Sequence, residues 1–175
     1  VYLGLYGSYG VAWFLKDMAF PDRNWQRRIT WGGGAAAFLL GLAPYWVLPW
    51  LLVSGRGHPP TAASLVACAI GIHTIGLFLM VAADAQKTFV LRGRAGLITD
   101  GMFRFVRHPN YLGEMMIYGS YALLVGHWAA WAILLGIWAV EFVPNMLAKE
   151  ASLSRYPEWE AYRSRTGALL PRLTR

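Results

Sequence analysis

Polar side chains of several kinds are concentrated in residues 101–114 of this otherwise apolar chain. They are Arg104, Arg107, His108, Asn110, Tyr111 and Glu114. A guanidinium group binds a phosphate through two parallel hydrogen bonds, and a nearby amide or carboxylate can hold the hydroxyl and amide groups of a nucleotide. This combination of side chains therefore predicts a site for a large anionic cofactor.

Two arginines and one acid upstream extend this prediction. Arg92 and Arg94 would add positive charge for a phosphate, and Asp84 would add a carboxylate. The two arginines could instead contact lipid headgroups and set the membrane topology. Both explanations stay open for them, whereas Arg107 is assigned to the site because other polar residues, beginning with His108, follow it directly.

Glu114 lies one helical turn after Asn110, on the same face of a helix that starts there. A carboxylate at or below the membrane interface is costly without a partner. We expect Arg107 or a ligand to be that partner. A contact with the positive end of the helix is the structural alternative.

The composition indicates a membrane protein. The chain of 175 residues is 57% hydrophobic and only 14% charged, whereas soluble domains carry about 25% charged residues. A net charge of +7 is compatible with nucleic-acid binding, but the basic residues flank apolar blocks, as in membrane proteins, so no nucleic acid is expected as a partner. The single cysteine, Cys68, excludes a disulfide framework, and no metal site is expected.

Apolar blocks predict an all-α, polytopic helical bundle in one membrane domain. The expected spans are residues 1–15, 31–53, 61–83, 110–126 and 129–147, with an amphipathic helix in the polar tail 148–175. The first block is shorter than the roughly 20 residues that a span needs, so part of it is expected to lie upstream of Val1. Residues 1–83 form the N-terminal helices, and residues 84–175 form the cofactor-binding half. Pro44 and Pro49 predict a kink in the second span.

The distribution of basic residues predicts the topology. Five alternating spans place the loops 16–30 and 84–109 and the tail on the same side of the membrane. All Lys and Arg residues except Arg56 lie in these three segments. Because positive charge accumulates on the cytoplasmic side, we expect the basic loops and the C-terminus to face the cytoplasm, the matrix or the stroma.

The polar stretch also carries a family resemblance. Residues 97–104 and the run Arg107-His108-Pro109-Asn110-Tyr111-x-Gly113-Glu114 resemble the C-terminal half of a membrane superfamily. That superfamily includes steroid 5-alpha-reductases, sterol reductases, isoprenylcysteine carboxyl methyltransferases and phospholipid methyltransferases. The resemblance covers residues 81–171, including the tail motif at 156–162. The first three spans add only general hydrophobicity.

Details of the motif favour the reductases. The segment 110–114 is similar to the reductases' cofactor motif, and Asp84 resembles an acidic position on the corresponding reductase helix. The methyltransferases typically carry a Glu-Glu pair where this chain has Lys149-Glu150. In contrast, residues 106–109 and 163–166 are similar to the methyltransferases. The resemblance thus implies a reductase first and a methyltransferase second.

The implied activity is NADPH-dependent reduction of a carbon–carbon double bond in a lipid or steroid-like molecule lying among membrane lipids. The resemblance implies cofactor contacts from Asp84, Arg92, Arg104, Arg107, His108, Asn110, Tyr111, Glu114, Glu150 and Tyr162. The alternative is methyl transfer from S-adenosylmethionine to a lipid or isoprenylcysteine-type substrate. The catalytic acid stays unassigned, because steroid reductases place it in the N-terminal half, which matches nothing here. A third hypothesis is a non-catalytic subunit of a larger membrane complex.

Two further features have both a structural and a functional explanation. The tail from Tyr156 to Tyr162 predicts an amphipathic interfacial helix, and the resemblance implies a lid over the nucleotide, which is compatible with it. Glu141 lies inside the last predicted span, where an acid by default indicates a functional site. It could equally pair with His73 or with an indole N–H, while His73 itself is expected to be a hydrogen-bonded interior residue.

Overall fold

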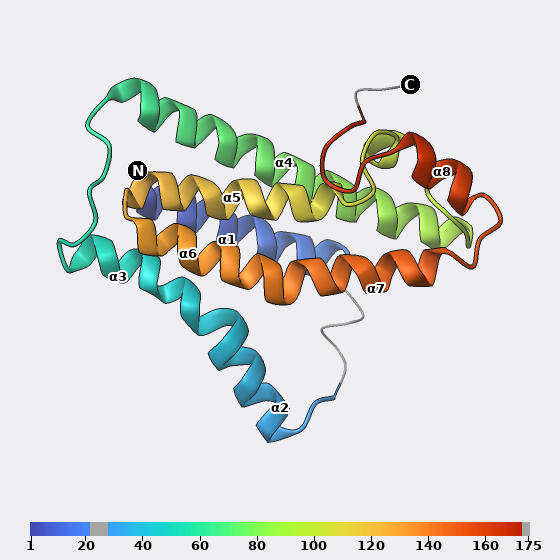
Figure 1. Cartoon of the computed structure of the whole chain (residues 1–175), viewed down its shortest axis with the longest axis horizontal. Helices are drawn as coiled ribbons and strands as arrows, with labels where there is room; N and C mark the ends of the chain where they lie inside the picture. Colours follow the sequence, from blue (N-terminus) through green and yellow to red (C-terminus); the bar gives the residue numbers. More distant parts are fainter. Residues whose placement is uncertain (22–27, 173–175) are drawn as a thin grey trace.

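Four long helical segments run back and forth alongside one another (Figure 1). They are α1 (Tyr2–Ala19), α4 (Ala63–Gly93), α5 (Pro109–Val125) and a continuous run made of α6 (Trp128–Ile137), the π-helical segment η5 (Trp138–Phe142) and α7 (Val143–Leu153). This computed structural model describes residues 1–21 and 28–172. The predicted all-helical bundle is confirmed.

The second predicted span is an irregular arm. It consists of α2 (Trp31–Ala36), the π-helical segment η2 (Ala37–Leu42), the 3-10 turn η3 (Ala43–Trp46) and α3 (Val47–Val53). α3 packs against α5, whereas α2 points away from the bundle (Figure 1). The predicted irregularity occurs at Pro44, in the 3-10 turn η3, because proline cannot donate a helical hydrogen bond and its ring crowds the preceding turn. Pro49, in contrast, lies inside the regular helix α3.

Among the described residues, three helical segments are long and apolar enough to cross a membrane. These are Trp31–Val53, Ala63–Gly93 and Trp128–Leu153. α5 is shorter, with 17 residues, and α1 carries the charged pair Lys16-Asp17 in its last turn. The structure thus supports a helical membrane bundle, and the expected number of five spans is matched only roughly.

Three helices extend beyond their predicted ends, and the first is α1, which reaches Ala19 instead of ending at residue 15. α4 continues to Gly93 instead of ending at residue 83, so Asp84 lies on a helix and not in a loop. The run ending in α7 continues to Leu153, so Glu150 also lies on a helix and not in the tail. The charged residues near these ends predict loops, but Glu, Lys and Gln are good helix formers. Of the tail as far as residue 172, only the short α8 (Trp159–Arg165) forms a separate helix.

Glycines allow α4 and α5 to pack closely. A Cβ atom added to Gly113 would lie 2.5 Å from the carbonyl oxygen of Gly76, and one added to Gly76 would lie 2.6 Å from that of Gly113. Buried Met80 and Ile117 belong to the core beside this contact. Backbone therefore faces backbone here, an arrangement that small residues permit between membrane helices.

His73 is an interior residue, as expected. Its Nε2 lies 3.3 Å from Ser8 Oγ, and its Nδ1 lies 3.4 Å from Ser120 Oγ. The histidine thus connects α4 to α1 and α5, and the hydrogen bonds shown by the structure join it to these serines and not to Glu141.

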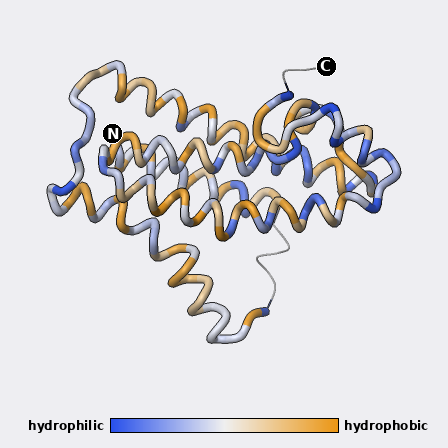
Figure 2. The backbone as a smooth tube through the Cα atoms, in the orientation of Figure 1, coloured by the Kyte–Doolittle hydropathy of each residue, from blue (hydrophilic) through white to orange (hydrophobic). Residues whose placement is uncertain are grey.

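Polar residues collect at one end of the bundle. The end of α4, the start of α5, the end of α7 and α8 meet there (Figure 1), and hydrophilic residues are dense in these segments (Figure 2). The turn that follows α3 and the turn between α5 and α6 lie at the opposite end (Figure 1). Arg23, Arg27 and Arg175, which the topology prediction includes, lie outside the described residues.

Candidate functional site

The loop between α4 and α5 is tethered by a glutamine. Gln86 on α4 donates from Nε2 to the carbonyl of Asp100 at 2.9 Å, and its Oε1 accepts from the N–H of Met102 at 2.8 Å. Gly101 between them has a φ of +55°, which glycine adopts most readily. Pro109 then opens α5, where its missing N–H costs nothing. The tether places Arg107 and His108 at the start of α5.

The tail runs beside this loop as a short parallel pairing. The N–H of Arg107 donates to the carbonyl of Gly167 at 2.9 Å, and that of His108 donates to the carbonyl of Ala168 at 3.0 Å. On α8, the Tyr162 hydroxyl donates to the carbonyl of Phe103 at 2.8 Å. Burial raises the pKa of Tyr162 to about 12, so the phenol keeps the proton that it donates. The tail is therefore fixed onto the loop.

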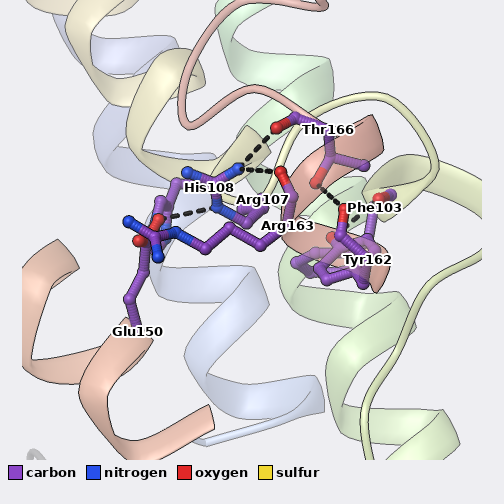
Figure 3. A network of polar contacts seen from close by, with 7 residues as sticks. All are labelled: Phe103, Arg107, His108, Glu150, Tyr162, Arg163 and Thr166. Carbon is purple, nitrogen blue, oxygen red and sulfur yellow. Dashed lines mark hydrogen bonds and ion pairs between the residues drawn. The ribbon is translucent and has the colours of Figure 1, made fainter. Parts of the chain in front are cut away.

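Arg107 is the centre of the polar network (Figure 3). Its Nε donates to Glu150 Oε1 at 2.7 Å, and Nη1 donates to the carbonyl of Thr166 at 2.5 Å and to that of Arg163 at 3.4 Å. The guanidinium is only 8% exposed. Arg107 thus joins α7 to the tail, and two of its nitrogens are used within the chain.

His108 shares the same carboxylate. Its Nε2 lies 3.2 Å from Glu150 Oε1. Desolvation by burial lowers the pKa of His108, and this outweighs the nearby carboxylate of Glu150. An ionised carboxylate only accepts hydrogen bonds, so the neutral ring carries its proton on Nε2 and donates it to Glu150.

A pocket of about 200 Å³ opens beside this network. The polar side chains that line it are Lys87, Arg107, His108, Asn110, Lys149, Ser152 and Tyr162. Apolar side chains from α4, the loop and α7 complete the lining. Cations line the pocket and no carboxylate does, so it favours an anionic group.

Some of the predicted residues meet at this pocket and others lie close to it. Arg107, His108, Asn110 and Tyr162 line it, and Glu150 holds two of them in place. Tyr111 does not line the pocket, but it contacts two residues that do. Its ring centre lies 5.9 Å from that of His108 and 4.4 Å from Lys149 Nζ. These six residues come from three separate segments.

The remaining predicted residues do not line the pocket. Asp84 forms an ion pair with Lys16 of α1 at 2.7 Å. Glu114 lies close enough to both to interact with them electrostatically. Arg92 and Arg104 are exposed, with their guanidinium groups over the rings of Phe89 and Phe105.

Lys87 and Lys149 line the pocket although the sequence analysis did not select them. Lys87 lies almost one helical turn after Asp84, so recognising that α4 continues would have revealed it. Lys149 was noticed only as a departure from a family pattern. Its charge next to Glu150 is the signal that was available.

The donor set fits part of a nucleotide cofactor. Lys87, Lys149 and the Asn110 amide suit a phosphate and a hydroxyl or amide group. Sites for drug-sized ligands usually enclose about 300–1,000 Å³, so a pocket of about 200 Å³ encloses only a portion of a dinucleotide. Among residues 1–21 and 28–172, no three His, Cys, Asp or Glu side chains are grouped to hold a metal ion.

Known proteins are similar to parts of this chain. Two uncharacterized proteins of Schizosaccharomyces pombe are each 31% identical to the chain, one over 106 residues (57% of this chain, 38% of the relative) and one over 87 residues (45% and 24%). Delta(14)-sterol reductase LBR of Gallus gallus is 33% identical over 87 residues, which are 40% of this chain and 14% of that protein. The chain thus spans less than half the length of these relatives. No solved structure matches it.

The family assignment rests on a longer match. The model of a family described as protein of unknown function (DUF1295) matches residues 38–167. That range includes the loop, the pocket and α8. Because it takes in well over half of the sequence, the chain belongs to the DUF1295 family.

Proposed function

We propose that the chain is the cofactor-binding part of a membrane-bound, NADPH-dependent reductase that acts on a carbon–carbon double bond of a lipid or steroid-like molecule. The observation that carries the proposal is the cationic pocket at the polar end of the bundle. The similarity to part of a sterol reductase supports the reaction class. The basic end of the bundle would then face the cytoplasm, matrix or stroma.

The residues of the pocket have separate tasks in this proposal. Lys87 and Lys149 bind phosphate, and Asn110 hydrogen-bonds the amide or ribose of the cofactor. Within the described part of the chain the Asn110 side chain has no hydrogen-bonding partner, so its amide is available to a ligand. Arg107 acts as a positioning residue, because it holds α7 and the tail together. NADPH, when bound, supplies the hydride.

A methyltransferase is the second candidate. S-adenosylmethionine is smaller than a dinucleotide phosphate, so the small pocket favours it. In this case the same residues would align a methyl donor with a lipid amine or carboxylate, and catalysis would come mainly from proximity. A non-catalytic subunit of a membrane complex is the third hypothesis, and such a subunit needs neither cofactor.

Calorimetry on the detergent-purified protein tests these alternatives. NADPH and S-adenosylmethionine are titrated separately into the wild type, Asn110→Ala and the control Asn145→Ala, which removes an exposed amide on α7. We expect NADPH to bind, with an affinity about tenfold lower for Asn110→Ala, since about 1.4 kcal/mol corresponds to a factor of ten. Binding of S-adenosylmethionine alone would make the methyltransferase the better proposal. Binding of neither would favour the accessory subunit.

A further inference from the structure

Glu141 is a carboxylate inside a membrane-spanning segment. It belongs to the π-helical segment η5, in the middle of the candidate span Trp128–Leu153. Within residues 1–21 and 28–172 it forms no hydrogen bond or ion pair. An acid at this depth is expensive unless a partner or ligand satisfies it.

A second π-helical segment faces this carboxylate. A Cβ atom added to Gly41 of η2 would lie 2.6 Å from Glu141 Oε1, so the carboxylate rests against the backbone of the irregular arm. Gly41 is buried. π-helical turns are rare and occur frequently at functional sites, and here two of them, on separate membrane segments, enclose one acid.

An unused hydrogen-bond donor lies on the same segment. The Nε1–H of Trp138 is buried and has no partner among the described residues. Trp138 and Tyr45 pack against the same two hydrophobic clusters. Glu141 interacts electrostatically with Tyr45, whose ring stacks on that of Tyr118 at 4.2 Å. The region therefore offers one hydrogen-bond acceptor, the Glu141 carboxylate, and one donor, the Trp138 indole, next to aromatic side chains.

We propose that Glu141, Trp138, Tyr45 and Gly41 form a binding site, the Glu141 site, for the hydroxyl end of a lipophilic alcohol. A hydroxyl both donates, as Glu141 requires, and accepts, as the Trp138 indole requires. An amine would satisfy only the carboxylate. A buried polar group without a partner is costly, and such a ligand removes this cost for the Trp138 indole and gives the Glu141 carboxylate a donor.

The Glu141 site is connected to the cofactor pocket by packed rings. Phe142, the next residue, lies 5.2 Å from the ring of Tyr111, which lies 5.9 Å from that of His108 in the pocket lining. This inference rests on the proposed function only in naming the alcohol as a substrate. As a binding site for a lipophilic alcohol it stands independently.

Photolabelling tests the site. The protein is reconstituted in nanodiscs and labelled with a diazirine-bearing sterol alcohol, with the unlabelled alcohol or its methyl ether as competitor. We expect labelled peptides from η2 or η5, and an ether that competes at least about tenfold more weakly than the alcohol, because it cannot donate to Glu141. Equal competition by the two compounds would overturn the proposal.

Two variants and a control make the test specific. Glu141→Leu removes the acceptor, and Gly41→Ala displaces the carboxylate without removing it; both should abolish the preference for the alcohol. The control Val140→Leu changes an adjacent side chain that is 74% exposed and should keep it. An unchanged preference in both test variants would contradict the site.

Calorimetry separates this inference from the proposed function. Retained NADPH binding by Glu141→Leu shows that the variant is folded and that the loss is confined to the Glu141 site. A wild type that prefers the alcohol but does not bind NADPH would support the site while refuting the proposed reductase. Loss of NADPH binding in Glu141→Leu would count against two separate sites.

Discussion

Two acids on one continuous helical run have opposite surroundings. Glu150, near the end of the run, accepts hydrogen bonds from Arg107 at 2.7 Å and from His108 at 3.2 Å. Glu141, further back on the same run, contacts the backbone near Gly41 and has no hydrogen-bond donor among the described residues. The first acid is part of a completed network, and the second is not.

This difference separates two uses of buried polarity. At the polar end, Glu150 accepts from both Arg107 and His108, and the resulting network fixes the shape of the pocket. At the Glu141 site, the half-buried carboxylate and the buried Trp138 indole N–H have no hydrogen-bonding partner among the described residues. Because buried polar groups are nearly always hydrogen-bonded, the second arrangement indicates a ligand, while the first indicates a scaffold for one.

The largest effect is expected from breaking the completed network. Glu150→Gln leaves the nearly buried Arg107 without its counter-charge, and we expect a loss of about 3 kcal/mol in the free energy of unfolding. Chemical denaturation in detergent measures it. The exposed Glu158→Gln is the control. Glu141→Leu should cost much less than Glu150→Gln, and equal losses would contradict the comparison.

Glycine substitutions compare the backbone contact between α4 and α5 with the contact between Gly41 and Glu141. Gly113→Ala forces a methyl group against the carbonyl of Gly76, and overpacking of this kind costs about 1–3 kcal/mol. Gly71→Ala on α4 is the matched control, because nothing lies within 4 Å of its added Cβ. Gly41→Ala should cost less than Gly113→Ala, since its methyl group meets the end of a flexible side chain. Thermal unfolding of the three variants provides the ranking.

The smallest effect is a pH dependence of the network. Burial lowers the pKa of His108 below its unfolded value of about 6.5. The contribution of the neutral His108 ring to folding stability is therefore fully present above pH 6.5. It is lost as the pH falls towards the pKa of the folded state, because the unfolded state binds the proton more tightly. Between pH 8 and pH 5, the melting temperature of His108→Gln should change less with pH than that of the wild type. The exposed His58→Gln should leave the slope unchanged.

Local sequence patterns predicted the helices better than the contacts between them. Apolar blocks and proline placed the start of α5 within one residue, because these signals act over a single turn. The continuation of α4 through Asp84 differs from the prediction, because a charged residue after an apolar block indicates the end of a span but does not stop a helix. The ion pair between Asp84 and Lys16 joins residues that are far apart in the sequence, so no pattern in the neighbouring residues predicts it.

The candidate site could be predicted only in part, because some of its residues are close in the sequence and others are not. Arg107, His108 and Asn110 are neighbours in the sequence, so their grouping could be anticipated. Lys87 joins them only because α4 continues and the loop folds back. Nothing in the residues around Arg107 indicates that it binds the carbonyl of Thr166, because backbone carbonyls carry no sequence information.

The pairing of the tail with the loop also sets an order of events during synthesis. The hydrogen bonds from Arg107 and His108 to the carbonyls of Thr166, Gly167 and Ala168 form only when these three residues have been made. The helices of the bundle, from α1 to α7, precede these residues in the chain, so they can be inserted before the pocket is complete. A chain that stops just before Thr166 retains α1 to α7 and lacks the carbonyl of Thr166 that accepts from Arg107 and the backbone that pairs with the loop.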